Sequence, residues 1–318
     1  MSKQQEIREQ VTARIVAALE KDNLPWRRPW VTRGPGRHTN VVSKRPYSGV
    51  NPLLLEIHAA AHGFRSHWWG TFNQWHSLGC TVQRRPDGVE PGQWGCGIVV
   101  YIPVTKKDEN PDTGEEEEET YWLLRKFTLF NANQVSGLRA DLYRLGELPP
   151  KPTEAQPDYQ PAEELIAKSG ADIRYGGDRA YYRLPSPEGS WPNHTAGDYI
   201  EVPPKASFIG GAFYPTILHE LAHWSEIRVG WDREKGGYAA GELVAEIASC
   251  FLATELGVPN GEPLENYAAY LKSWLEAMKS DANYIFKASR QASKVCDFLL
   301  SFVRQDATEP TPELVEAA

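Results

Sequence analysis

The sequence has few of the features that mark secreted, membrane-bound or disulfide-built proteins. Its 318 residues include only four cysteines, with no CxxC pair among them, and show no internal repeat. No apolar run is long enough to cross a bilayer, and the first residues lack the hydrophobic core of a signal peptide. Scattered cysteines of this kind are typical of free thiols in a reducing compartment. We therefore expect a cytoplasmic protein with no membrane partner.

A proline-rich stretch divides the chain. Five prolines lie between Gly146 and Pro161, where they exclude regular helix or sheet. Because 318 residues are enough for two hydrophobic cores, we interpret residues 146–161 as a linker. It would join a domain of residues 1–145 to one of residues 162–304. The polar residues 305–318 are expected to form a flexible tail.

Hydrophobic periodicity predicts an α+β fold. In the first half, helical spacing precedes two strands that would pair as a small antiparallel sheet; the helices are expected at 6–20, 52–62 and 71–78, and the strands at 97–104 and 121–131. In the second half, short strands precede helices; strands are expected at 171–175, 180–184 and 199–202, and later helices at 266–277 and 282–302.

An acidic run lies between the two long strands. Five consecutive glutamates occupy positions 115–119. Like charges at this density repel and stay hydrated, which predicts a mobile hairpin tip without chemistry of its own. An acidic arm that mimics nucleic-acid phosphate is the alternative.

Charge and tryptophan are concentrated at the N-terminal end. The chain has a net charge of −8, yet residues 1–100 carry 13 lysines and arginines against 7 acidic residues, and six of the eleven tryptophans. Cations that follow a phosphate backbone, together with rings that stack on unpaired bases, favour a single-stranded nucleic-acid surface. The alternative is that these tryptophans are core residues, which is their usual place.

The clearest motif for chemistry is the sequence His-Glu-Leu-Ala-His from His219 to His223. On a helix, imidazoles four residues apart point from one face toward a single metal ion. Glu220, beside them, can then take a proton from a water molecule at that metal. So loose a pattern also arises by chance, but Pro215 suits a helix start and the apolar neighbours would bury one face. We interpret the segment as a hydrolase site.

A catalytic zinc site needs a third protein ligand and keeps one position open for water. Glu242 lies nineteen residues after His223, and Glu246 shares its helical face at i, i+4. This spacing resembles glutamate-ligated zincins, which implies that Glu242 binds the metal while Glu246 hydrogen-bonds a ligand histidine. A pair of solvated carboxylates is the alternative. The donor set predicts Zn²⁺, although it also accepts other divalent metals.

Motifs along nearly the whole chain carry a family resemblance. They are residues 25–30 (PWRRPW), 46–51 (PYSGVN), 71–74 (TFNQ), 130–134 (FNANQ), 198–200 (DYI), 219–224 (HELAHW) and 241–246 (GELVAE). Together they resemble the ArdC antirestriction proteins of conjugative plasmids and phages. The resemblance implies a single-stranded-DNA-binding domain joined to a zincin-like metallopeptidase domain. Gly241, where the family usually has a second glutamate, and the glutamate run depart from its pattern.

The resemblance also implies which side chains lie near DNA. Arginine and lysine would contact phosphate, aromatic rings would stack, and amides would hydrogen-bond bases or backbone. The expected residues are Trp26, Arg27, Arg28, Trp30, Lys44, Arg45, Tyr47, Asn51 and Gln74. Any of these aromatic rings could instead belong to the core.

The expected function is antirestriction: the protein would bind single-stranded DNA and protect incoming plasmid or phage DNA, and it would carry a metallopeptidase-like domain. One alternative is a DNA-directed zinc metallopeptidase that cleaves a protein partner, with protection secondary. A plain protease with an incidental basic domain is the other.

Overall fold

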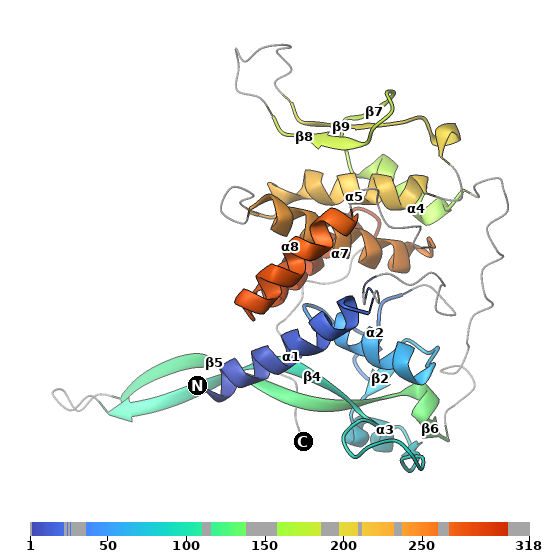
Figure 1. Ribbon diagram of the computed structural model, residues 1–318. Helices are drawn as coiled ribbons and strands as arrows, with labels where there is room; N and C mark the ends of the chain where they lie inside the picture. Colours follow the sequence, from blue (N-terminus) through green and yellow to red (C-terminus); the bar gives the residue numbers. More distant parts are fainter. Residues whose placement is uncertain are drawn as a thin grey trace.

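The computed structural model describes residues 2–21, 24, 26, 36–109, 116–137, 158–185, 197–208, 212–231, 237–259 and 267–304. The chain forms two stacked parts (Figure 1). The N-terminal part contains a long hairpin and three helices, and the C-terminal part is a group of helices with a small sheet on its far side.

The N-terminal part contains a four-stranded sheet in the order β1-β2-β5-β4. Its strands are β1 (Thr39–Asn40), β2 (Trp68–Gly70), β4 (Cys96–Glu109) and β5 (Glu116–Asn131). The sheet is antiparallel, as expected, except that β1 and β2 run parallel. The helices of the N-terminal part are α1 (Lys3–Leu19), α2 (Asn51–His62) and α3 (Phe72–Ser77). A second, two-stranded sheet pairs β3 (Thr81–Val82) with β6 (Val135–Ser136), which follows the 3-10 turn η1 (Ala132–Gln134).

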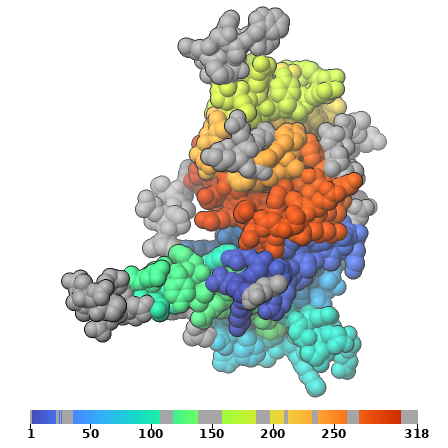
Figure 2. Space-filling model, turned by 60° about the vertical axis from the view of Figure 1, so that its left-hand side comes forward, coloured from blue at the N-terminus to red at the C-terminus, as the bar shows by residue number. Residues whose placement is uncertain are grey.

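The hairpin is longer than the sequence predicts. Glu116 to Glu119, assigned above to a mobile tip, belong to strand β5. They pair with residues 106–109 of β4, so that Lys106 lies opposite Glu119 and Lys107 opposite Glu118. The lysine opposite Glu119 offsets part of the repulsion within the glutamate run. The hairpin projects as an arm from the body of the molecule (Figure 2).

The C-terminal part begins with helix α4 (Gln160–Lys168). A three-stranded sheet follows in the order β7-β9-β8, made of β7 (Ile173–Tyr175), β8 (Tyr181–Arg183) and β9 (Tyr199–Val202). After the 3-10 turn η2 (Lys205–Ser207) come α5 (Phe213–Glu226), α7 (Tyr238–Leu256), α8 (Tyr267–Ser280) and α9 (Tyr284–Ser301). Among the described helices, none combines the length and the apolar character needed to cross a membrane.

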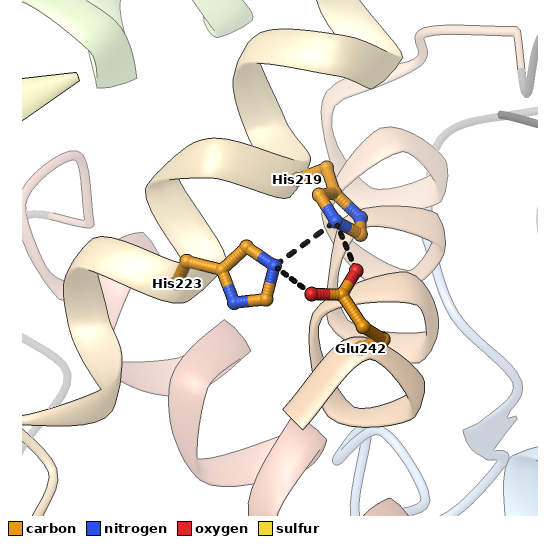
Figure 3. A group of neighbouring side chains, drawn as sticks. All are labelled: His219, His223 and Glu242. Carbon is orange, nitrogen blue, oxygen red and sulfur yellow. Dashed lines mark hydrogen bonds and ion pairs between the residues drawn. The ribbon is translucent and has the colours of Figure 1, made fainter. Parts of the chain in front are cut away.

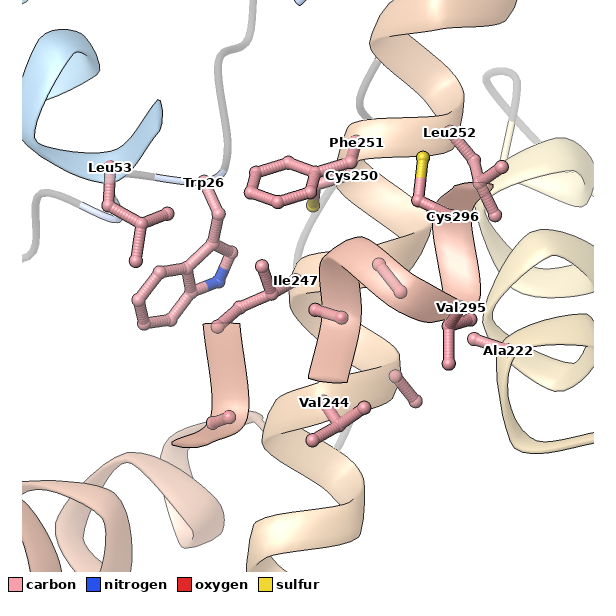
Figure 4. Packing of buried hydrophobic residues seen from close by; sticks show 14 of the residues in the cluster. Trp26, Leu53, Ala222, Val244, Ile247, Cys250, Phe251, Leu252, Val295 and Cys296 are labelled. Carbon is pink, nitrogen blue, oxygen red and sulfur yellow. The ribbon is translucent and has the colours of Figure 1, made fainter. Parts of the chain in front are cut away.

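The two parts share one hydrophobic core. Trp26 and Leu53 from the N-terminal part pack in the same cluster as Ile247 and Phe251 of α7 (Figure 4). Beside this core, the buried Arg37 bridges Glu255 of α7 at 2.7 Å and Asp297 of α9 at 2.9 Å. The predicted linker, residues 146–161, lies mostly outside the described residues, and α4 begins inside its range at Gln160.

Candidate metal centre

Helix α5 carries both histidines and is almost completely buried. Pro215 lies in its first turn, where the missing N–H costs no intrahelical hydrogen bond. Ile217, Leu218 and Leu221 are fully buried against the neighbouring helices. The helix is therefore anchored by packing, and the imidazoles have little freedom to move.

The two imidazoles and the Glu242 carboxylate face one point (Figure 3). Nε2 of His219 lies 3.1 Å from Nε2 of His223. The carboxylate oxygens of Glu242 lie 3.5 Å from His219 Nε2 and 3.4 Å from His223 Nε2. The three residues are between 4 and 8 % exposed. Two helices, α5 and α7, thus bring the three predicted ligands together.

The spacing of these atoms fits a divalent cation. In a tetrahedral site with bonds of about 2.0–2.2 Å, neighbouring ligand atoms are about 3.3–3.6 Å apart. The three observed separations, 3.1, 3.4 and 3.5 Å, lie close to that range. Two neutral imidazoles and one carboxylate are also a donor set that zinc and similar ions accept. The residues present could therefore hold such an ion with little rearrangement.

The charge balance of the cluster also favours a cation. Burial disfavours charge on His223, but hydrogen bonds with Glu226 and Glu242 outweigh it and raise the pKa of that ring to about 9. Burial likewise disfavours charge on Glu242, yet hydrogen bonds from both histidines hold its pKa well below the usual range. The pocket therefore stabilises positive charge beside the Glu242 carboxylate, and a metal ion would supply that charge.

Glu220 lies beside the ligand pair, as the motif requires. The residue is 8 % exposed, and its negative charge contributes to the raised pKa of His223. A buried carboxylate next to a metal ion is suited to accept a proton.

Each imidazole is also faced by a carboxylate on its other side. Glu226 hydrogen-bonds Nδ1 of His223 at 2.7 Å and is only 2 % exposed. Glu246 lies 4.0 Å from Nδ1 of His219, the position expected for a supporting residue. Among the described residues, Nδ1 of His219 has no hydrogen-bond partner. A small movement of Glu246 would complete the second pair.

The predicted DNA contacts are placed very differently from one another. Trp26 is 4 % exposed and its ring packs edge-on against Trp274 at 6.2 Å. No base can stack on a ring enclosed in this way, so the prediction for Trp26 is wrong. The side-chain amide of Asn51 donates a hydrogen bond to the carbonyl of Val99 at 2.7 Å and accepts one from the Val99 N–H at 3.0 Å. These two bonds tie α2 to β4. The amide oxygen and nitrogen of Asn51 are therefore both hydrogen-bonded within the fold.

Other predicted contacts surround the turn after β1. Lys44 and Arg45 are exposed there. Tyr47 accepts a hydrogen bond from Asn40 at 2.9 Å, and Gln74 accepts one from the same amide at 3.1 Å. Both side chains are half-buried, and through Asn40 they link the turn to α3. The predicted contacts Arg27, Arg28 and Trp30 lie outside the described residues.

Known protein families match both halves of the chain. The N-terminal domain of anti-restriction factor ArdC matches residues 5–130, and a zincin-like metallopeptidase domain matches residues 160–291. The metal-free crystal structure of antirestriction ArdC protein from the R388 plasmid is 32% identical, with a TM-score of 0.70. That alignment covers 93% of this chain and 97% of the R388 protein. The chain belongs to the ArdC family.

Membership of the ArdC family confirms the predicted α+β architecture of a sheet-containing N-terminal domain and a zincin-like C-terminal domain. The Mn(II)-bound structure of R388 ArdC is also similar, with a TM-score of 0.67, 30% identity and coverage of 93% of this chain and 97% of that one. Uncharacterized protein y4eC of Sinorhizobium fredii is 33% identical over 92% of this chain and 91% of its own length. DNA primase TraC of Escherichia coli is 32% identical over 96% of this chain, which spans 28% of TraC.

Glu226 was not among the site residues predicted from the sequence of this ArdC family member. A signal was present, because a glutamate three residues after the second histidine lies on the same helical face. In a neutral His223, donation from Nδ1 to Glu226 would leave the lone pair of Nε2 free for a metal.

Replacing Glu226 by alanine is expected to weaken divalent metal binding by about 10- to 100-fold, the usual effect of losing a carboxylate behind a ligand histidine. Glu226→Gln, which can still accept the Nδ1 hydrogen bond, should recover part of that loss. Competition with a chromophoric chelator measures both, with Glu164→Ala, on the exposed side of α4, as the control. Unchanged affinity in Glu226→Ala would show that the contact serves packing alone.

Proposed function

We propose that the protein is an antirestriction factor that binds single-stranded DNA and protects incoming plasmid or phage DNA in the cytoplasm. The observation that carries this proposal is the similarity to antirestriction ArdC of R388 along nearly the full length of both chains. The match to TraC, a DNA primase, gives further support for action on DNA.

We further propose that the C-terminal domain is a zinc metallopeptidase. His219, His223 and Glu242 would hold the metal, and Glu226 and Glu246 would orient the two imidazoles. A bound divalent metal would polarise a water molecule and the carbonyl group of a peptide. Glu220 would take the proton from the attacking water and pass it to the leaving amine. The substrate would be a protein or peptide.

The small sheet offers a place for that peptide. Strand β8 forms one edge of the sheet and contacts helix α5. An extended peptide that added to this edge by backbone hydrogen bonds would run along α5. The packing of β8 on the histidine helix therefore supports peptide hydrolysis over hydrolysis of a small molecule.

A plasmid-transfer assay into a restricting host tests the proposal. Because coating of DNA requires no proteolysis, we expect Glu220→Gln to protect the incoming plasmid as well as the original protein does. Transfer into a host without restriction is the control. A loss of protection in Glu220→Gln would favour the alternative of a DNA-directed metallopeptidase. Equal transfer with and without the original protein would contradict antirestriction altogether.

A further inference from the structure

Two parallel strands bring a basic turn and an exposed aromatic helix to the same edge of the N-terminal sheet. Thr39 and Asn40 of β1 pair in parallel with Trp68 and Trp69 of β2, so the chain leaves both strands at the same end. After β1 it forms the turn that holds Lys44 and Arg45, and after β2 it enters α3. The Asn40–Gln74 hydrogen bond of 3.1 Å ties the turn to α3.

Two aromatic side chains lie at this edge, the exposed Phe72 and the half-buried Trp68, whose ring also contacts the ring of His67. Phe72, the first residue of α3, is 54 % exposed and lies parallel to the ring of His76. Trp68 is half-buried, and Nζ of Lys44 lies 4.6 Å from its ring centre. Trp68 packs against the small core cluster that contains the fully buried Trp75 of α3, the helix that also carries Phe72.

We propose that single-stranded DNA binds across this edge, with bases stacked on Trp68 and Phe72 and phosphates held by Lys44 and Arg45. These four residues form the sheet-edge platform. The inference rests on the proposed single-strand binding and states where on the molecule it occurs.

The charges around the platform suit a polyanion. Residues 57–86 contain three arginines and no acidic residue, and residues 39–55 contain Lys44 and Arg45 and no acidic residue. The nearby Glu56 already lies 3.1 Å from His38. A phosphate backbone at the platform would meet cations without a carboxylate close in sequence to repel it. Rings beside such cations are the usual composition of a single-strand surface.

The backbone conformation at Lys44 permits a substitution that tests DNA binding without straining the turn. Lys44 has φ of 60°, and it is the sole non-glycine residue with positive φ in the described part of the chain. Its Nζ also donates to the carbonyl of Val41 at 2.6 Å. Because glycine adopts this conformation freely, Lys44→Gly removes the cation while it relaxes the backbone. Weaker DNA binding by this variant could not be attributed to a strained turn.

The projecting hairpin provides the competing surface. Trp122 is 56 % exposed and Tyr101 is 45 % exposed on its strands. However, Glu118 and Glu119 lie on the outer part of the hairpin. These carboxylates would repel phosphate, so we exclude the hairpin as the base-stacking surface. Trp122 then serves as the matched control for Phe72.

The experiment uses the full chain and a fluorescein-labelled oligothymidine, with binding followed by fluorescence anisotropy. Loss of one stacked base should weaken binding by about 5- to 150-fold in Phe72→Ala and in Trp68→Ala, whereas Trp122→Ala should bind normally. Lys44→Gly and Arg45→Gln should each lower the slope of log affinity against log salt by about 0.7. Thermal unfolding of every variant confirms that it is folded.

The outcomes separate this inference from the function on which it rests. If the original protein does not bind the oligonucleotide, the proposed single-strand binding fails and the platform fails with it. If the original protein binds and Phe72→Ala and Lys44→Gly bind equally well, the platform is wrong while the function stands. Weakening by Trp122→Ala alone would place the strand on the hairpin and would also overturn the platform.

Discussion

Replacing Glu242 by alanine is expected to weaken divalent metal binding by more than about 100-fold. A carboxylate behind a ligand histidine is commonly worth about 10- to 100-fold in metal affinity, and a direct ligand should be worth more. Glu242 is also the one negative side chain in the cluster of potential ligands found among the described residues. Without it, two imidazoles remain, and the pocket loses the charge that favours a cation. Isothermal titration of the metal-free protein with Zn²⁺ measures the loss.

Two further variants make this test specific. Glu276→Ala removes an exposed glutamate from α8 and should leave metal affinity unchanged. Glu246→Ala removes the carboxylate 4.0 Å from His219 Nδ1 and should have a smaller effect than Glu242→Ala. Metal binding that survives Glu242→Ala and is lost in Glu246→Ala would show that the ligand is Glu246.

Glu220→Gln is expected to lower the rate of peptide hydrolysis by at least about 100-fold, while the affinity for metal stays unchanged. Glutamine has almost the shape of glutamate but cannot accept the proton of the attacking water, and general base catalysis is commonly worth about 10²- to 10⁴-fold. Because Glu220 is buried, a water molecule cannot readily take over its role as the base. Cleavage of an unfolded protein substrate such as casein, measured with and without single-stranded DNA, gives the rate.

The same titration with Zn²⁺ must accompany the Glu220→Gln assay, because loss of metal would also abolish cleavage. A variant that keeps the metal and still cleaves at the original rate would remove Glu220 from its proposed role. Cleavage by neither protein under any condition would restrict the C-terminal domain to metal binding.

The clustering of His219, His223 and Glu242 could be predicted because its geometry is largely local. His219 and His223 lie on one helical face by spacing alone, and Glu242 follows in α7, the next helix among the described residues. Glu226 obeys the same local rule, but its role depends on its contact with Nδ1 of His223, and the sequence does not specify which ring nitrogen it meets.

The aromatic residues of the N-terminal part were harder to predict because their burial depends on distant elements. Trp26 is enclosed by Trp274 of α8, and no short-range pattern in the sequence indicates that contact. Trp68 and Trp69 are adjacent in β2, where side chains alternate between faces. One had to be more exposed than the other, but the pattern alone could not say which. The structure shows that Trp69 is fully buried and Trp68 is not.

The glutamate run shows another limit of sequence patterns. Like-charge repulsion predicts a solvated loop, yet the cross-strand partners of the last two glutamates are lysines. The pairing register decides which residues lie opposite the glutamates, and the long apolar part of the hairpin sets that register.

The most direct measurement is anomalous diffraction at the zinc edge from crystals of the full chain grown with Zn²⁺. We predict one strong peak bonded at about 2.0–2.2 Å to Nε2 of His219, Nε2 of His223 and a carboxylate oxygen of Glu242. A structure with no peak at this cluster, or with Glu242 turned away from both histidines while zinc binds elsewhere, would contradict the proposed centre.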